Sequence, residues 1–94
     1  MIRSFANDST EIFWLTGTSK RIPPANLRRV ALRKLVMLDS ATELKDLRVP
    51  PGNRLEELRG DRKGQYSIRI NDQYRVCFRW SEGHAYDAEI VDYH

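Results

Sequence analysis

Polar residues able to act on a phosphate ester are concentrated in the second half of this 94-residue chain. They fall at the ends of predicted strands or on the less apolar strand faces, and they are Glu56, Arg59, Arg62, Arg69, Arg75, Asp92, Tyr93 and His94. Metal-free cleavage of RNA needs these residue types. A base takes the proton of the 2′-hydroxyl, a cation stabilises the pentavalent phosphate, and an acid protonates the leaving 5′-oxygen. Arginines beside carboxylates are also common as structural ion pairs, so composition alone leaves both interpretations open.

Other functional classes are disfavoured by the motifs that the sequence lacks. It contains no GxxxxGK[ST], GxGxxG, HExxH or GxSxG pattern, the commonest signals of nucleotide hydrolysis, dinucleotide binding, zinc proteolysis and ester hydrolysis. The single cysteine, Cys77, has no partner for a disulfide or a CxxC metal site. We therefore expect no metal and no cofactor. No apolar run approaches the roughly 18 residues of a membrane span, and a signal peptide is not recognisable, so we expect a cytoplasmic protein with no membrane partner.

Basic residues are unevenly distributed along the chain. Lysine and arginine number 16 against 13 acids, and 15 of the 16 lie between Lys20 and Arg79. Arginine predominates there, and its planar fork suits bidentate contact with phosphate. The stretch therefore predicts contact with a nucleic acid, although exposed arginines also occur simply as solvated surface. The residues predicted to contact RNA are Arg28, Arg29, Arg33, Lys34, Arg62, Arg69 and Arg79.

Two helices are predicted in the first half of the chain. Asp8 or Ser9 is expected to cap a short helix over residues 11–15, which Gly17 ends. A longer helix is expected from Pro23-Pro24 to about Asp39, with an apolar stripe formed by Leu27, Val30, Ala31, Leu35 and Leu38. Its opposite side is expected to carry the basic residues Arg28, Arg29, Arg33 and Lys34.

Strands are predicted at the start of the chain and throughout its second half. Residues 1–5 form a first strand, and Ser40 or Thr42 caps a helical turn over residues 43–47. Further strands are expected over residues 54–58, 65–71, 74–80 and 84–93. Alternation in the middle two places Arg69, Arg75 and Arg79 on one face. The order predicts a single α+β domain over residues 1–94, with an antiparallel sheet packed against two N-terminal helices.

Five blocks of the sequence resemble HigB-type toxins of bacterial toxin–antitoxin modules. They are residues 41–44 (ATEL), 50–56 (PPGNRLE), 58–69 (LRGDRKGQYSIR), 71–78 (NDQYRVCF) and 89–94 (EIVDYH). The blocks are ordered, which makes the resemblance specific, and it covers nearly the whole chain. HigB toxins belong to the RelE/ParE superfamily, so the resemblance implies a compact antiparallel sheet with two helices on one side. The same order of elements follows independently from the patterns above.

The resemblance implies an activity and partners. It implies a ribosome-dependent endoribonuclease, an mRNA interferase that cuts messenger RNA in the A site of the 70S ribosome and so inhibits translation. The attack of the 2′-hydroxyl on the scissile phosphate would need no metal. The implied partner is a HigA-like antitoxin with a helix-turn-helix domain, through which the complex contacts operator DNA.

The resemblance also gives roles to five candidate catalytic residues. Arg75 matches the arginine that contacts the phosphate. Tyr93 and His94 match the Asp-Tyr-His ending, where the tyrosine orients or donates to the phosphate and the histidine suits proton transfer. Arg59 stands where relatives often have lysine, and a guanidinium keeps the charge but does not release a proton. Glu56 stands where some relatives have histidine, which leaves the identity of the general base open.

Two alternatives to a nuclease stay open. A ParE-like toxin of the same fold would inhibit DNA gyrase without cutting RNA, because a fold does not determine a function. Arg75 and the Tyr93-His94 ending favour the nuclease over this alternative. A catalytically inactive relative that only binds the ribosome or the antitoxin is the second alternative, which Glu56 and Arg59 make conceivable.

Overall fold

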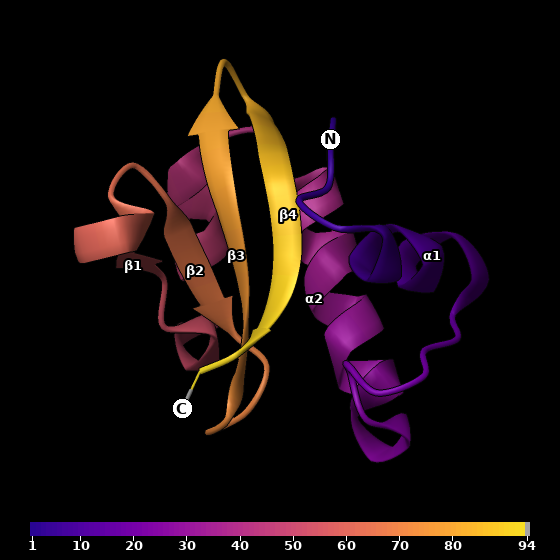
Figure 1. Ribbon diagram of the computed structural model, residues 1–94. Helices are drawn as coiled ribbons and strands as arrows, with labels where there is room; N and C mark the ends of the chain where they lie inside the picture. The colour runs from indigo at the N-terminus through magenta and orange to yellow at the C-terminus, as the bar shows by residue number, and fades with distance from the viewer. Residues whose placement is uncertain (94) are drawn as a thin grey trace.

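Four antiparallel strands in the order β1-β2-β3-β4 form the sheet of the computed structural model, which describes residues 1–93 (Figure 1). They are β1 (Glu56–Glu57), β2 (Tyr66–Arg69), β3 (Tyr74–Ser81) and β4 (His84–Asp92). Two α-helices precede them, α1 (Asp8–Thr16) and α2 (Arg28–Ser40). The helix α2 lies against one face of the sheet (Figure 1). The predicted α+β class and antiparallel meander are confirmed.

The N-cap of helix α1 lies before both predicted caps. It is Asn7, whose extended backbone lets its Oδ1 accept a hydrogen bond of 2.9 Å from the N–H of Thr10. The prediction that Asp8 or Ser9 caps the helix is therefore wrong. Gly17 ends α1 as predicted, with φ of 76° and an N–H that donates to the carbonyl of Phe13.

Helix α2 begins later than predicted. Pro24 is still extended, and a 3-10 turn, η1 (Ala25–Leu27), separates it from the first residue of the helix. The apolar stripe is confirmed, because Ala31, Leu35 and Leu38 are fully buried in the core. After α2, the turn η2 (Leu44–Arg48) is capped by the reciprocal hydrogen bonds of Glu43 and Asp46, not by Ser40 or Thr42 as predicted.

Two of the predicted strands are largely absent, and the strand predicted over residues 65–71 is shortened to β2, Tyr66–Arg69. Residues 1–5 form only the isolated parallel bridges Ile2–Ala85 and Phe5–Ala88 along the free edge of β4. The strand predicted over residues 54–58 is reduced to the two residues of β1, since Arg54 has a left-handed backbone with φ of 46°. Both segments nevertheless pair with the sheet, β1 with β2 and the N-terminal residues with β4. The N-terminal residues thus cover the edge of β4, which would otherwise be unpaired.

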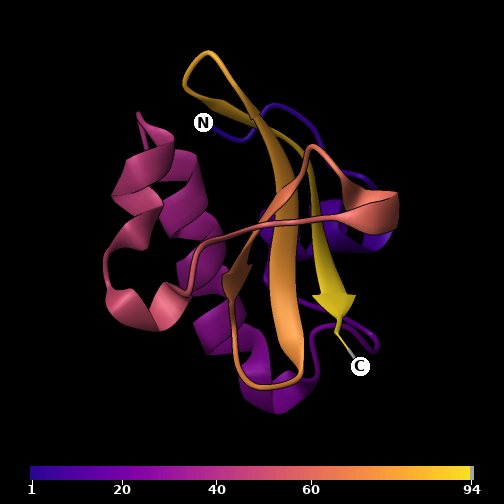
Figure 2. The same cartoon turned by 90° about the vertical axis from the view of Figure 1, so that its left-hand side faces the viewer.

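The two faces of the sheet differ in character. On the helix side, Ile68, Val76 and Ile90 lie in cross-strand register and are buried in the core. The register shift between β3 and β4 coincides with Asp87, whose φ of 54° marks a bulge that keeps Ala85 and Ala88 buried on either side of it. The turn η4 (Gly60–Arg62) lies on the opposite side of the strands from α2 (Figure 2).

Within residues 1–93, the helices are all too short or too polar to cross a membrane.

Candidate functional site

Arg75 lies on the sheet face that points away from α2, and three hydrogen bonds hold its guanidinium. It is only 8% exposed, and its Nε donates to Ser67 Oγ on the neighbouring strand at 2.7 Å. Its Nη2 donates to the backbone carbonyl of Arg54 at 2.6 Å and more weakly to that of Ser67 at 3.4 Å. Two fixed oxygens thus determine the plane of the guanidinium, which is pre-oriented before any ligand arrives.

Tyr93 meets Arg75 just beyond the end of β4. The Cζ atom of Arg75 lies 5.7 Å from the centroid of the tyrosine ring, and the tyrosine is 43% exposed. This distance is within the range of a cation–π contact. Two of the predicted catalytic residues, 18 positions apart in the sequence, are therefore brought together at the surface. His94 lies outside the described residues.

Glu56 is placed on the same face as Arg75 by the strand register. It pairs with Ser67 across β1 and β2, and directly opposed residues of antiparallel strands project to the same side of a sheet. Its side chain is exposed. Arg59 is also exposed, just before η4, and its side chain makes no hydrogen bond or ion pair with another residue of 1–93. The structure thus groups Arg75, Tyr93 and Glu56 on one face and shows no contact between Arg59 and them.

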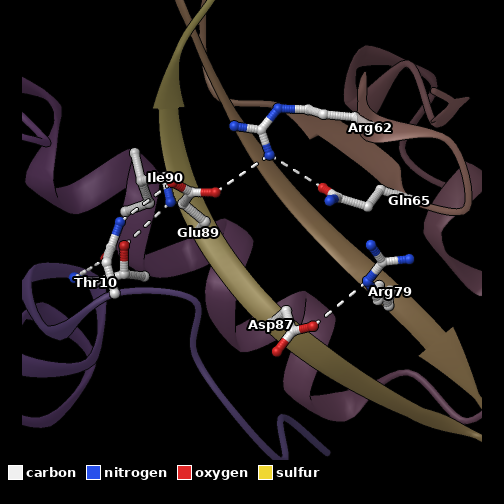
Figure 3. Close-up of polar contacts among 8 residues, drawn as sticks. Thr10, Arg62, Gln65, Arg79, Asp87, Glu89 and Ile90 are labelled. Carbon is white, nitrogen blue, oxygen red and sulfur yellow. Dashed lines mark hydrogen bonds and ion pairs between the residues drawn. The ribbon is translucent and has the colours of Figure 1, made fainter. Parts of the chain in front are cut away.

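Three other arginines on or near this face, Arg62, Arg69 and Arg79, are each paired with a carboxylate. Arg62 lies between Glu89 and Gln65, and Arg79 lies against Asp87 (Figure 3). Nη1 of Arg62 is 3.2 Å from Oε1 of Glu89 and 3.1 Å from Oε1 of Gln65, and Nε of Arg79 is 3.5 Å from Oδ2 of Asp87. Arg69 pairs with Asp72 at 2.5 Å, and this hydrogen bond lowers the pKa of the Asp72 carboxyl. By contrast, Arg75 has no carboxylate partner within residues 1–93, because both of its partners are neutral. Its positive charge is therefore not cancelled by a described neighbour.

The predicted basic side of α2 is only partly present. Arg29 and Arg33 are exposed as predicted, whereas Arg28 is half-buried and holds Ser19 through its Nε and Nη2. The placement of Lys34 at the solvent-facing side is wrong, since the residue is 6% exposed and its Nζ donates to Asn53 Oδ1. Burial lowers the pKa of Lys34.

A helical pattern explains this error. Lys34 lies three residues after Ala31 and four before Leu38, so it belongs to the buried stripe and not to the opposite side. The spacing was therefore a usable signal, which the charge of the lysine obscured.

Two grooves lie outside the site around Arg75. One of about 360 Å³ lies between η2 and β1, and one of about 780 Å³ lies between α1 and the loop that follows it. Arg75 and Tyr93 line neither of them.

The comparison with protein families agrees with these features. A family described as the RelE-like toxin of type II toxin-antitoxin system HigB matches residues 3–94. The chain belongs to this family of HigB-like toxins. Members of a type II toxin–antitoxin system act with an antitoxin, so the chain has an antitoxin partner.

Individual relatives support the same assignment. The chain is 42% identical over 90 residues to Toxin HigB-1 of Vibrio cholerae, covering 96% of this chain and 95% of the relative. It is 33% identical over 98 residues to Endoribonuclease HigB of Proteus vulgaris, covering both chains completely. The solved YoeB-YefM complex from Staphylococcus aureus contains a chain that matches with a TM-score of 0.61 over all of this HigB-like toxin and 98% of the other chain. At 17% identity, that likeness concerns the fold.

Two groups that hold Arg75 were not among the predicted site residues. Ser67 is fully buried on the arginine-bearing face, and its position was available from the period-two alternation with Arg69. The carbonyl of Arg54 had no such signal, because its direction depends on a left-handed backbone conformation that sequence patterns do not specify.

Proposed function

We propose that this HigB-like toxin is an endoribonuclease that cuts messenger RNA on the ribosome, and that its active site is the face of the sheet around Arg75. The observation that carries the proposal is the state of this guanidinium. It is fixed by Ser67 and Arg54, it has no carboxylate partner among residues 1–93, and its Nη1 donates to none of them. A fixed, uncancelled cation with a free N–H suits the developing charge of a phosphate in its transition state. The name of the Proteus vulgaris relative, an endoribonuclease, supports the same activity.

The proposed reaction is a transesterification within the RNA. The 2′-oxygen attacks the adjacent phosphorus, the bond from phosphorus to the 5′-oxygen breaks, and a 2′,3′-cyclic phosphate and a 5′-hydroxyl form. Glu56 takes the proton from the 2′-hydroxyl, Arg75 donates to a non-bridging oxygen, and Tyr93 orients the phosphate. His94 protonates the leaving 5′-oxygen. The scheme uses no metal.

The ribosome supplies the rest of the catalysis in this proposal. Few side chains at the site can transfer protons, so holding the RNA strand in an attacking geometry must lower much of the barrier. The exposed Arg29, Arg33 and Arg59 contribute phosphate contacts that depend on salt concentration. A HigA-like antitoxin neutralises the toxin, the complex contacts operator DNA through the antitoxin, and the toxin acts in the cytoplasm.

Primer extension on a defined messenger RNA in a reconstituted translation system tests the proposal. The reactions compare the intact protein, its Arg75→Ala variant, an Arg21→Ala variant and a control without ribosomes. Arg21 is an exposed arginine outside the predicted site, so this variant controls for the loss of one positive charge. Circular dichroism confirms that all variants are folded.

We expect cuts within A-site codons for the intact protein and for Arg21→Ala, and none for Arg75→Ala or without ribosomes. If expression of the intact protein inhibits bacterial growth but the protein makes no cuts in the translation system, the nuclease proposal is refuted. Inhibition of gyrase, or ribosome binding without cleavage, would then be the function to test. Cuts that persist in Arg75→Ala would show that the site lies elsewhere.

A further inference from the structure

Asn53 is a buried polar residue whose side chain takes no part in the proposed reaction but connects α2 to the turns before β1. It is fully buried, and its side-chain amide joins three segments of the chain. Its Oδ1 accepts from Lys34 Nζ of α2 at 2.5 Å, and its Nδ2 donates to the carbonyls of Leu47 and Val49 at 3.2 and 3.4 Å. Both the oxygen and the nitrogen of the amide are therefore hydrogen-bonded, and these bonds hold residues 47–53 against α2.

The next residue adopts an unusual backbone conformation. Arg54 has φ of 46° and ψ of 56°, the left-handed region that non-glycine residues rarely occupy, and its N–H donates to the carbonyl of Pro51 at 3.1 Å. Such a conformation persists only where the surrounding structure holds it. Here the surrounding structure is the turn η3 (Pro51–Asn53) and the anchored amide of Asn53. The result is a carbonyl of Arg54 that lies 2.6 Å from Nη2 of Arg75.

We propose that Lys34 and Asn53 are positioning residues for Arg75. Their hydrogen bonds hold the turn that ends at Arg54, and the carbonyl of this turn is one of the two oxygens that set the plane of the guanidinium. This inference deepens the proposed function and rests on it for its kinetic consequence. Without the carbonyl, the guanidinium keeps only Ser67 as its partner, and Nη1 loses its fixed direction. A misplacement of about 1 Å at a reacting group can reduce a rate about 100-fold.

Lysine and asparagine suit this role for a physical reason. A charged donor makes a shorter and stronger hydrogen bond than a neutral donor, and the amide accepts it while still offering donors to the backbone. The hydrogen-bonded pair of Lys34 and Asn53 is called the anchor below. Because the acceptor in the anchor is a neutral amide, the anchor adds no negative charge near the phosphate site.

The test uses two variants of the anchor and one control. Asn53→Ala removes all the hydrogen bonds of the amide, including a weak one from Nδ2 to Met37 Sδ at 3.8 Å. Asn53→Asp keeps an acceptor for Lys34 but loses the donations to the carbonyls of Leu47 and Val49. Phe13→Leu is the control for lost stability, because Phe13 is fully buried in α1 and belongs to neither the site nor the anchor.

Two measurements are made on each protein. The first is side-chain 15N NMR of Arg75, which reports the rate of rotation about the Cζ–Nη2 bond, a motion that the hydrogen bond to Arg54 slows. The second is single-turnover cleavage of ribosome-bound messenger RNA, which separates the rate at saturation from the concentration that gives half of that rate. Positioning predicts a change in the saturating rate, whereas lost binding predicts a change in the half-saturating concentration.

For Asn53→Ala we expect faster rotation of the Arg75 Nη2 group and a saturating rate reduced about 10- to 100-fold. Asn53→Asp should show the same changes to a smaller degree, and Phe13→Leu should show neither. If Asn53→Ala does not fold, Asn53→Asp decides. Unchanged rotation and an unchanged saturating rate in the folded Asn53 variants would overturn the inference. If the intact protein cuts no RNA, the proposed function fails, and the NMR measurement alone then supports or overturns the positioning of Arg75.

Discussion

Replacing Ser67 by alanine tests how firmly the sheet holds Arg75. The substitution removes the Oγ that accepts from Arg75 Nε at 2.7 Å, in a fully buried position. A hydrogen bond to a charged group contributes about 1.5 to 3 kcal/mol, and the Arg54 carbonyl still holds Nη2. We therefore expect Ser67→Ala to lower the free energy of unfolding by about 2 kcal/mol. With an m-value of about 1 to 1.5 kcal/mol/M for urea, the unfolding midpoint should decrease by about 1.3 to 2 M.

The assay is urea unfolding followed by circular dichroism, with Ser81→Ala as the control. Ser81 is an exposed serine at the end of β3, the strand that carries Arg75, so its replacement should change the stability by less than about 0.5 kcal/mol. Cleavage by Ser67→Ala should also slow about tenfold, which corresponds to 1.4 kcal/mol in the barrier. If the two serine variants have the same midpoint and the same cleavage rate, Ser67 does not hold Arg75 and the reasoning fails.

Three further predictions concern the fold. Burial, Arg3 and the N-terminal amino group lower the pKa of His84 below its ordinary 6.5, so the unfolded state binds more protons there and stability should fall as the pH drops through 6.5 towards the lower pKa of the folded state. Urea midpoints across this range should show the slope, and His84→Gln should reduce it. Asn7→Ala removes the N-cap of α1 and should cost about 1 kcal/mol, and an unchanged urea midpoint would contradict the cap. Gly64→Ala, at φ of 90°, should cost at least about 1 kcal/mol in thermal unfolding, whereas Gly52→Ala, in open space, should be nearly neutral.

The regular part of the fold could be predicted because its signals are periodic. The alternation of Ile68 and Val76 with Arg69 and Arg75 identifies strands and their faces, and the register confirms that Arg69 lies opposite Arg75. The apolar stripe of α2 is equally regular. In both cases the buried face recurs at a fixed spacing, which a sequence displays directly.

The positions of single polar groups were less predictable. Lys34 has a charge that suggests solvent, but its hydrogen bond to buried Asn53 offsets part of the cost of its burial. The carbonyl of Arg54 belongs to the backbone, and so no residue type reveals where it points. The family resemblance identified Arg75 as a candidate, whereas the Arg54 carbonyl that helps to orient it emerged only from the three-dimensional arrangement.

The partners of Arg75 explain why this arginine, among those of the open face, suits a phosphate. Arg62, Arg69 and Arg79 each face a carboxylate, and such a pair must exchange its partner before it can bind another anion. Arg75 is held by neutral oxygens within the described chain, so its orientation is fixed while its charge stays available. Burying a cation against neutral partners costs more stability than leaving it in water. Replacing Arg75 with an apolar residue would therefore raise the free energy of unfolding, if stability were the only requirement. A buried arginine without a carboxylate partner, next to an exposed tyrosine, is better explained by a ligand that supplies the missing negative charge.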